Sequence, residues 1–145
     1  MTFTYESPFG PLFIEGRDRV VARLGFGRLG GAPPDSAVTA QLDEFFAGER
    51  TSFDLVFELA GTEFERRVWQ EVASIPYGST ATYAEIATRI GRPSACRAVG
   101  RANGRNPVAL VIPCHRVVGS DGSLTGYAGG LEMKRALLAM EAGAR

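Results

Sequence analysis

The sequence is poor in the side chains that bind metals and form disulfides. It contains two cysteines and a single histidine in 145 residues. Two cysteines cannot build a disulfide framework, and together with one histidine they fall short of the four ligands of a usual structural zinc site. We therefore expect no structural metal and no cofactor.

Long apolar runs are also missing. No stretch approaches the length of a membrane span, and the N-terminal residues lack the pattern of a signal peptide. Hydrophobic residues make up 45% of the chain and charged residues 22%, which is ordinary for a folded soluble protein. The length predicts one domain or two small lobes. We expect a cytoplasmic monomer without a membrane partner.

Acidic residues are absent from the segment 86–120. The segment carries six arginines, whereas residues 1–85 hold 7 arginines and 13 acids, so a formal net charge of zero hides a separation of charge. This pattern favours a polyanionic partner or an electropositive setting for a thiolate. It also fits a solvated arginine surface that the acidic part neutralises, and charge alone does not decide. The six arginines are Arg89, Arg92, Arg97, Arg101, Arg105 and Arg116.

Residues 1–60 read as a small β-sheet lobe with a helix. Short apolar runs at 3–5, 12–14 and 20–24 are separated by glycine, proline and aspartate turns, which predicts three strands. Apolar residues at helical spacing predict a helix over 36–47, and an alternating run predicts a further strand over 53–59.

Residues 61–145 read as a mostly helical second lobe, so the predicted fold class is α+β. Capping boxes begin at Thr62 and Thr82 and predict helices to about Val72 and Ile90. Further helices are predicted over 94–103 and 131–141. The helices on either side of Gly91-Arg92-Pro93 form a candidate helix-turn-helix.

The predicted helix over 94–103 combines small side chains with arginines. Arg97 and Arg101 are four residues apart and share a face. Such a helix can approach another backbone closely and suits a nucleic-acid groove, above all a minor groove. The alternative is tight helix–helix packing through the same small residues, which are Ala95, Cys96, Ala98, Gly100 and Ala102.

The tetrapeptide Pro113-Cys114-His115-Arg116 holds the only histidine beside a cysteine, after the apolar run 108–112 that predicts a buried strand. A cysteine with a nearby base can act as a nucleophile, although a buried cysteine often serves only as a small apolar residue. Because adjacent residues do not face each other in regular structure, His115 needs a water or a sharp turn to reach the thiol. It also needs an orienting carboxylate. Glu141 is our candidate, and Asp121 is the competitor.

Several segments together resemble one family, the O6-alkylguanine-DNA alkyltransferases, also called methylated-DNA–protein-cysteine methyltransferases. The resemblance runs in order from about Gly61 to Gly143, and a looser match covers residues 7–12. Its motifs are Ile75–Gly78, Arg97–Gly100, Asn106–Val108, Ile112–Val118, Gly126–Gly130 and Leu137–Glu141.

The resemblance implies a single-use repair protein that flips O6-alkylguanine from double-stranded DNA and takes its alkyl group. Cys114 would be the acceptor, His115 would deprotonate it through a water, and Glu141 would orient His115. Tyr83 would assist the leaving guanine and rotate the phosphate, and Arg97 would fill the gap left by the base.

The resemblance also assigns supporting residues. The surface that faces the minor groove would be formed by Ala95, Cys96 and Gly100, with Arg101 as a further DNA contact. The substrate pocket would involve Asn106, Val117, Tyr127 and Ala128. Two other hypotheses remain open at this point: a lesion-binding module that recruits repair proteins without chemistry, and a Cys-His-Glu hydrolase acting on small molecules.

Overall fold

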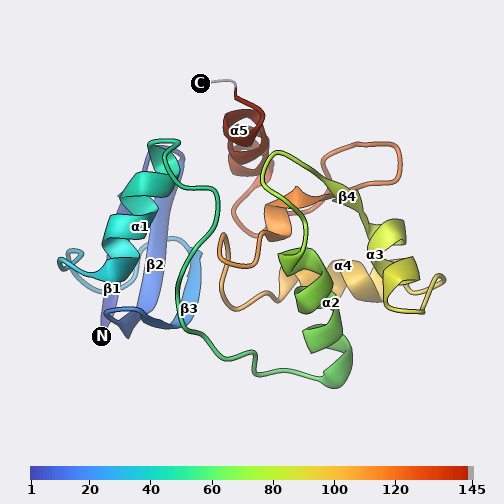
Figure 1. Ribbon diagram of the computed structural model, residues 1–145, viewed down its shortest axis with the longest axis horizontal. Coiled ribbons are helices and arrows are strands. Elements are labelled where there is room, and N and C mark those ends of the chain that lie inside the picture. The colour runs from blue at the N-terminus through green and yellow to red at the C-terminus, as the bar shows by residue number, and fades with distance from the viewer. Residues whose placement is uncertain (144–145) are drawn as a thin grey trace. The chain divides into compact units, whose positions relative to one another are not determined.

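The computed structural model describes residues 1–143, and the chain divides into two compact units (Figure 1). The N-terminal unit comprises residues 1–58 and 107–111. The C-terminal unit comprises residues 59–106 and the chain from Ile112 onward. A three-stranded antiparallel sheet is followed by the helices, so the predicted α+β fold class is confirmed.

The sheet of the N-terminal unit is a meander in the order β1-β2-β3. Its strands are β1 (Thr2–Ser7), β2 (Gly10–Arg17) and β3 (Val20–Phe26), which confirms the three strands predicted from the sequence. The predicted helix is also present as α1 (Ala37–Phe46), with the Ser36 side chain capping its N-terminus. Helix α1 lies along the sheet in Figure 1, and the Tyr5 hydroxyl of β1 donates a 2.6 Å hydrogen bond to Asp43.

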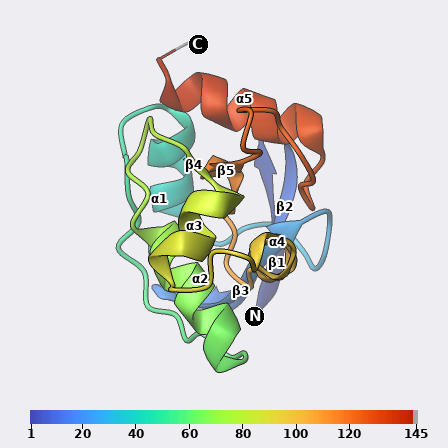
Figure 2. The same cartoon turned by 90° about the vertical axis from the view of Figure 1, so that its right-hand side faces the viewer.

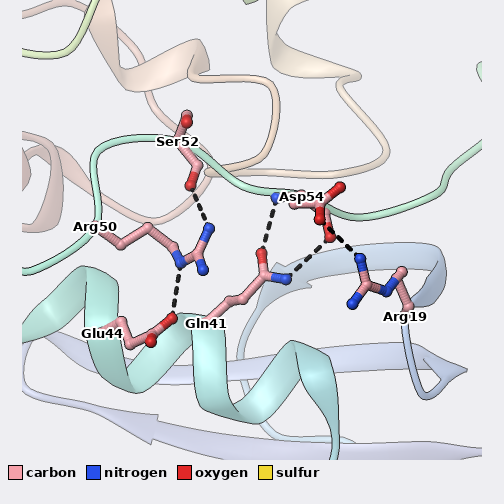
Figure 3. A network of polar contacts seen from close by, with 6 residues as sticks. All are labelled: Arg19, Gln41, Glu44, Arg50, Ser52 and Asp54. Atoms are coloured by element: carbon pink, nitrogen blue, oxygen red, sulfur yellow. Dashed lines mark hydrogen bonds and ion pairs between the residues drawn. The ribbon is translucent and has the colours of Figure 1, made fainter.

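The strand predicted over 53–59 does not form. Only Val56 pairs with a strand, through a bridge to Val20. Instead, the amide side chain of Gln41 on α1 accepts a bond of 2.8 Å from the Asp54 N–H and donates one of 2.9 Å to the Asp54 carbonyl (Figure 3). A side chain thus replaces the neighbouring strand that this segment would need.

The strand predicted over 108–112 is also wrong, although most of the segment is buried. Val108 forms an isolated bridge with Leu24 of β3, and then the chain turns at Leu110, whose φ is 69°. A non-glycine residue with positive φ cannot continue an extended strand. The Asn106 side chain donates a 2.7 Å hydrogen bond to the Ile112 carbonyl, which closes this excursion of the chain.

Three helices form the body of the C-terminal unit: α2 (Glu63–Ala73), α3 (Tyr83–Arg89) and α4 (Cys96–Gly104). They lie side by side in Figures 1 and 2 and contact one another. Both predicted capping boxes are present, at Thr62 and Thr82. The buried Trp69 of α2 donates a 2.8 Å hydrogen bond from Nε1 to the carbonyl of Ala102, which fixes α4 against α2.

The rest of the C-terminal unit consists of short elements and one long helix. The parallel pair β4 (Ala81–Thr82) and β5 (Val117–Val118) joins the start of α3 to the 3₁₀ turn η1 (Cys114–Arg116). The last helix, α5 (Leu131–Glu141), has the predicted bounds and contacts η1. Within residues 1–143, none of the helices is both long and apolar enough to span a membrane, and no cluster of potential metal ligands occurs.

Candidate active site

Cys114 opens the 3₁₀ turn η1, directly after Pro113. Consecutive side chains of a 3₁₀ turn point in different directions about a third of a turn apart. The turn therefore does not bond His115 directly to the thiol, since Nδ1 of His115 has no hydrogen-bond partner within residues 1–143, and a water is still needed between the two side chains. Cys114 is buried, and the Asn103 side chain donates a 3.2 Å hydrogen bond to its carbonyl.

His115 and Glu141 form a buried pair. The imidazole Nε2 lies 2.7 Å from Oε2 of Glu141, and the side chains are 0% and 1% exposed. Because an ionised carboxylate only accepts hydrogen bonds, Nε2 carries the proton and donates. Asp121, the competing candidate, accepts a bond from the Ser123 N–H within its own exposed turn.

Arg116 holds the same carboxylate from a second side. Its Nε donates to Oε1 of Glu141 at 2.8 Å and its Nη2 donates to Oε2 at 3.0 Å. Its Nη1 donates to the carbonyl of Ile75 at 2.8 Å. Although burial raises the pKa of Glu141, the hydrogen bonds and charges of His115 and Arg116 outweigh that effect and lower the pKa to about 2.

The other nitrogen of the imidazole is available for chemistry. Nδ1 of His115 is buried and has no hydrogen-bond partner within residues 1–143. Burial lowers the pKa of His115 below its ordinary value of 6.5, against the opposing effect of Glu141. A neutral imidazole that donates from Nε2 has a free lone pair on Nδ1, so this nitrogen can accept a proton.

The thiol of Cys114 needs such a base. Burial raises the pKa of Cys114, while hydrogen bonds from Asn106 and Tyr127 and the charge of Lys134 lower it in part. Lys134, which lies outside the 86–120 segment, is thus the cation whose charge lowers the pKa of this thiol. The sequence had suggested that the arginines of that segment provide the electropositive setting. The net upward shift leaves a neutral thiol at neutral pH.

Lys134 lies fully buried between two tyrosines. Its Nζ is 5.9 Å from the ring centroids of both Tyr83 and Tyr127 and donates a 2.9 Å hydrogen bond to the Thr125 carbonyl. The Tyr83 hydroxyl donates a 3.4 Å bond to the same carbonyl. Tyr83 is the first residue of α3, and its bond to Thr125 places it next to the segment that carries Tyr127.

The predicted contact face of α4 is partly open. Arg97 and Arg101 are exposed, and Ala95, Cys96 and Gly100 are half-buried. Gly100 lies next to the Tyr83 ring, since a Cβ atom built there would meet that ring at 3.8 Å. The face and one candidate catalytic residue are therefore neighbours.

The remaining predicted pocket residues are placed differently from one another. Asn106 and Tyr127 lie beside Cys114 and lower the pKa of its thiol, and Val117, which follows η1, is fully buried. Ala128 is exposed in the segment before α5. Three residues were not predicted: Arg116, Lys134 and Asn103. The sequence signal available for Lys134 was its place on the same helix stripe as Glu141, and no signal pointed to Asn103.

Comparison with known proteins shows the family to which the chain belongs. The model of the family "6-O-methylguanine DNA methyltransferase, DNA binding domain" matches residues 63–143. The chain belongs to this family. A methylated-DNA–protein-cysteine methyltransferase from Mycolicibacterium paratuberculosis is 49% identical, with 95% of this chain and 90% of that protein covered.

Two solved structures agree with the fold of this chain. The OGT of Mycobacterium tuberculosis in complex with DNA superimposes with a TM-score of 0.89 and 46% identity, covering 99% of this chain and 93% of that chain. Atl1 of Schizosaccharomyces pombe, in complex with damaged DNA containing O6-carboxymethylguanine, is 34% identical with a TM-score of 0.51. That match covers 57% of this chain and 79% of Atl1.

Proposed function

We propose that the protein repairs alkylated DNA directly, by moving an alkyl group from O6 of guanine onto Cys114 in a single, irreversible turnover. The observation that carries the proposal is the buried His115–Glu141 pair directly after the buried Cys114, in a chain of the methyltransferase family. A buried neutral thiol beside an imidazole with a free Nδ1 is equipped to become a thiolate only when a substrate is in place.

The alkyl transfer requires no cofactor. Nδ1 of His115 takes the thiol proton through a water, and Glu141 stabilises the resulting imidazolium. The sulfur forms a bond to the alkyl carbon while the bond from that carbon to O6 breaks. Guanine leaves as an anion, and the Tyr83 hydroxyl donates a proton or hydrogen bond to its N3. The thioether that forms on Cys114 is stable, so each protein acts once.

The lesion reaches Cys114 by leaving the base stack. Arg97 on α4 enters the minor groove and fills the gap, while the small residues Ala95, Cys96 and Gly100 let the helix approach the backbone. Arg101 contacts phosphate and adds affinity without sequence preference. The exposure of both arginines supports this assignment. One monomer acts on one lesion.

The pocket for the flipped base is built from backbone groups of Cys114, Val117 and Ala128, which read the purine edge, with Tyr127 lining it. Asn106 joins α4 to the segment that leads to Cys114. Its side-chain bonds to the Ile112 carbonyl and to the thiol support a role in holding the nucleophile.

Mass spectrometry of the intact protein after incubation with duplex DNA containing O6-methylguanine tests the proposal. We expect one adduct with the mass of a single CH2 group, located on Cys114 by peptide mapping. Cys114→Ala should abolish transfer and keep DNA binding, whereas Cys96→Ser removes the other thiol and should still form the adduct on Cys114.

Two outcomes would contradict the proposal. An unmodified Cys114 in a protein that binds the lesion tightly would favour a lesion-binding module. Turnover of a small-molecule substrate beyond one equivalent, without DNA, would favour a hydrolase.

A further inference from the structure

Arg116 is the one arginine of the 86–120 segment that does not face solvent. It is 6% exposed, and three of its nitrogens donate hydrogen bonds to Glu141 and to the Ile75 carbonyl. Its guanidinium also lies 5.5 Å from the centroid of the Tyr77 ring. The DNA contacts proposed for Arg97 and Arg101 do not involve Arg116, and its bonds connect it to the pair of His115 and Glu141 instead.

The two-nitrogen grip on Glu141 fixes the direction of the carboxylate. A guanidinium fork and a carboxylate match in plane and spacing, which makes the pair stiff. Arg116 and His115 share one oxygen, Oε2, at 3.0 and 2.7 Å. The imidazole ring is therefore oriented by a carboxylate that cannot rotate, and its Nδ1 points in a constant direction.

The charges of Arg116 and Glu141 also affect the protonation of His115. With Arg116 and Glu141 ionised and His115 neutral, the three buried side chains carry no net charge. Protonation of His115 would give them one positive charge, and the neighbouring Lys134 would oppose it. Without Arg116 the protonated form of His115 would be favoured instead, because the ionised Glu141 would then stabilise the imidazolium beside it without an opposing charge.

We propose that Arg116 is a positioning residue of the relay, which offsets the charge of Glu141 and so keeps His115 neutral and able to accept the thiol proton. This inference rests on the proposed function. Burial and the charges of Arg116 and Lys134 lower the pKa of His115, whereas the hydrogen bond and charge of Glu141 raise it. The remaining titratable neighbours are Cys114, the adjacent Tyr127, and Tyr77, whose ring lies against Arg116.

The lone histidine makes the test direct. In protein labelled with nitrogen-15, the imidazole signals belong to His115 and can be titrated by NMR without DNA. We expect the wild type to show a neutral ring with its proton on Nε2 and a pKa below the ordinary 6.5. A wild-type pKa at or above that value would overturn the proposal without any variant.

Two substitutions separate charge from shape. Arg116→Gln keeps hydrogen-bond donors without the charge, and we expect the His115 pKa to rise. Arg116→Lys keeps the charge and loses the fork, so the pKa should stay close to that of the wild type. Arg67→Gln is the matched control, since Arg67 donates to the Ile90 carbonyl and has no bond to Glu141.

Alkyl-transfer kinetics complete the test. In Arg116→Gln the ratio of the transfer rate near pH 6 to that near pH 8 should fall about tenfold, the effect expected from removing one charge at this range. In Arg116→Lys this ratio should be nearly normal, with a lower rate at every pH. A purely structural role would lower the rate of both variants uniformly and leave the His115 titration unchanged.

The inference and the proposed function fail in different ways. Absence of transfer by the wild type would contradict the function while the NMR titration still judged the role of Arg116. Normal transfer by the wild type with an unshifted titration in Arg116→Gln would overturn the inference alone.

Discussion

Nε2 of His115 and Oε2 of Glu141 lie 2.7 Å apart although 26 positions separate the two residues in the sequence. His115 belongs to η1, and Glu141 is the last residue of α5. The relay therefore exists only when α5 is packed against η1. This makes the last helix part of the candidate active site, and it ties the stability of that packing to the protonation of Glu141.

We expect acid to destabilise the protein through Glu141. Its pKa falls from the ordinary 4.5 to about 2 on folding. A lowered carboxyl pKa stabilises the fold above pH 4.5, and this contribution disappears as the pH falls from 4.5 toward 2. It amounts to a free energy on the order of 3 kcal/mol. Denaturant unfolding at several pH values measures it.

Glu141→Gln should remove most of this pH dependence. The variant should also unfold more easily at neutral pH, by about 3–5 kcal/mol, because Arg116 loses its buried partner. Glu63→Gln, at an exposed position of α2, is the control and should follow the wild type. An unchanged slope of stability between pH 4.5 and 2 in Glu141→Gln would contradict the assignment.

Lys134→Met should make Cys114 less reactive. The charge of Lys134 lowers the pKa of the thiol, so its removal raises that pKa and decreases the thiolate fraction at a given pH. Methionine preserves the length and the apolar contacts of the buried stem. The rate of modification by iodoacetamide, measured across pH in a Cys96→Ser background, reports on Cys114 alone.

Arg135→Met is the matched control for this measurement. Arg135 neighbours Lys134 on α5 but is exposed, so its substitution should leave the rate unchanged. Equal rates for Lys134→Met and the wild type would mean that the charge of Lys134 does not act on the thiol.

Local signals in the sequence were sufficient to predict where the helices lie. The capping boxes at Thr62 and Thr82 determine helix starts through bonds within four residues, and both are present in the structure. The relay was also predictable in part. Once Cys114 and His115 were taken as nucleophile and base, the absence of acids from 86–120 meant that the carboxylate that orients the imidazole had to come from outside this segment. Of the two candidates, Glu141 and Asp121, Glu141 is the one that bonds to His115.

The two wrong strands share a physical cause. A strand needs a partner, and an apolar or alternating run does not say whether a free strand edge is available. At 53–59 the Gln41 side chain takes the place of a partner, and at 108–112 the positive φ of Leu110 ends the extended conformation. The role of Arg116 could not be predicted either, because its burial follows from contacts with Ile75 and Glu141, which are far away in the sequence.

Gln41→Ala should destabilise the N-terminal unit. The substitution leaves the N–H and carbonyl groups of Asp54 without their bonds to Gln41 (Figure 3), at a cost of about 1–3 kcal/mol. Arg19→Ala is the control, because it removes only the exposed ion pair with Asp54 and should cost less than about 1 kcal/mol. Equal unfolding free energies for the two variants would contradict this role of Gln41.

Gly100→Ala should weaken DNA binding without weakening the fold. A Cβ atom at this position meets only the Tyr83 ring, at an ordinary contact distance of 3.8 Å, so the protein itself does not require glycine there. Alanine in a helix interior should even stabilise α4 by about 0.5–1 kcal/mol. If α4 enters the minor groove through its small residues, the added methyl group meets the DNA backbone instead. Fluorescence anisotropy with duplex DNA, paired with thermal unfolding, separates the two effects, and undiminished affinity in a normally folded Gly100→Ala would place the DNA contact on another face of α4.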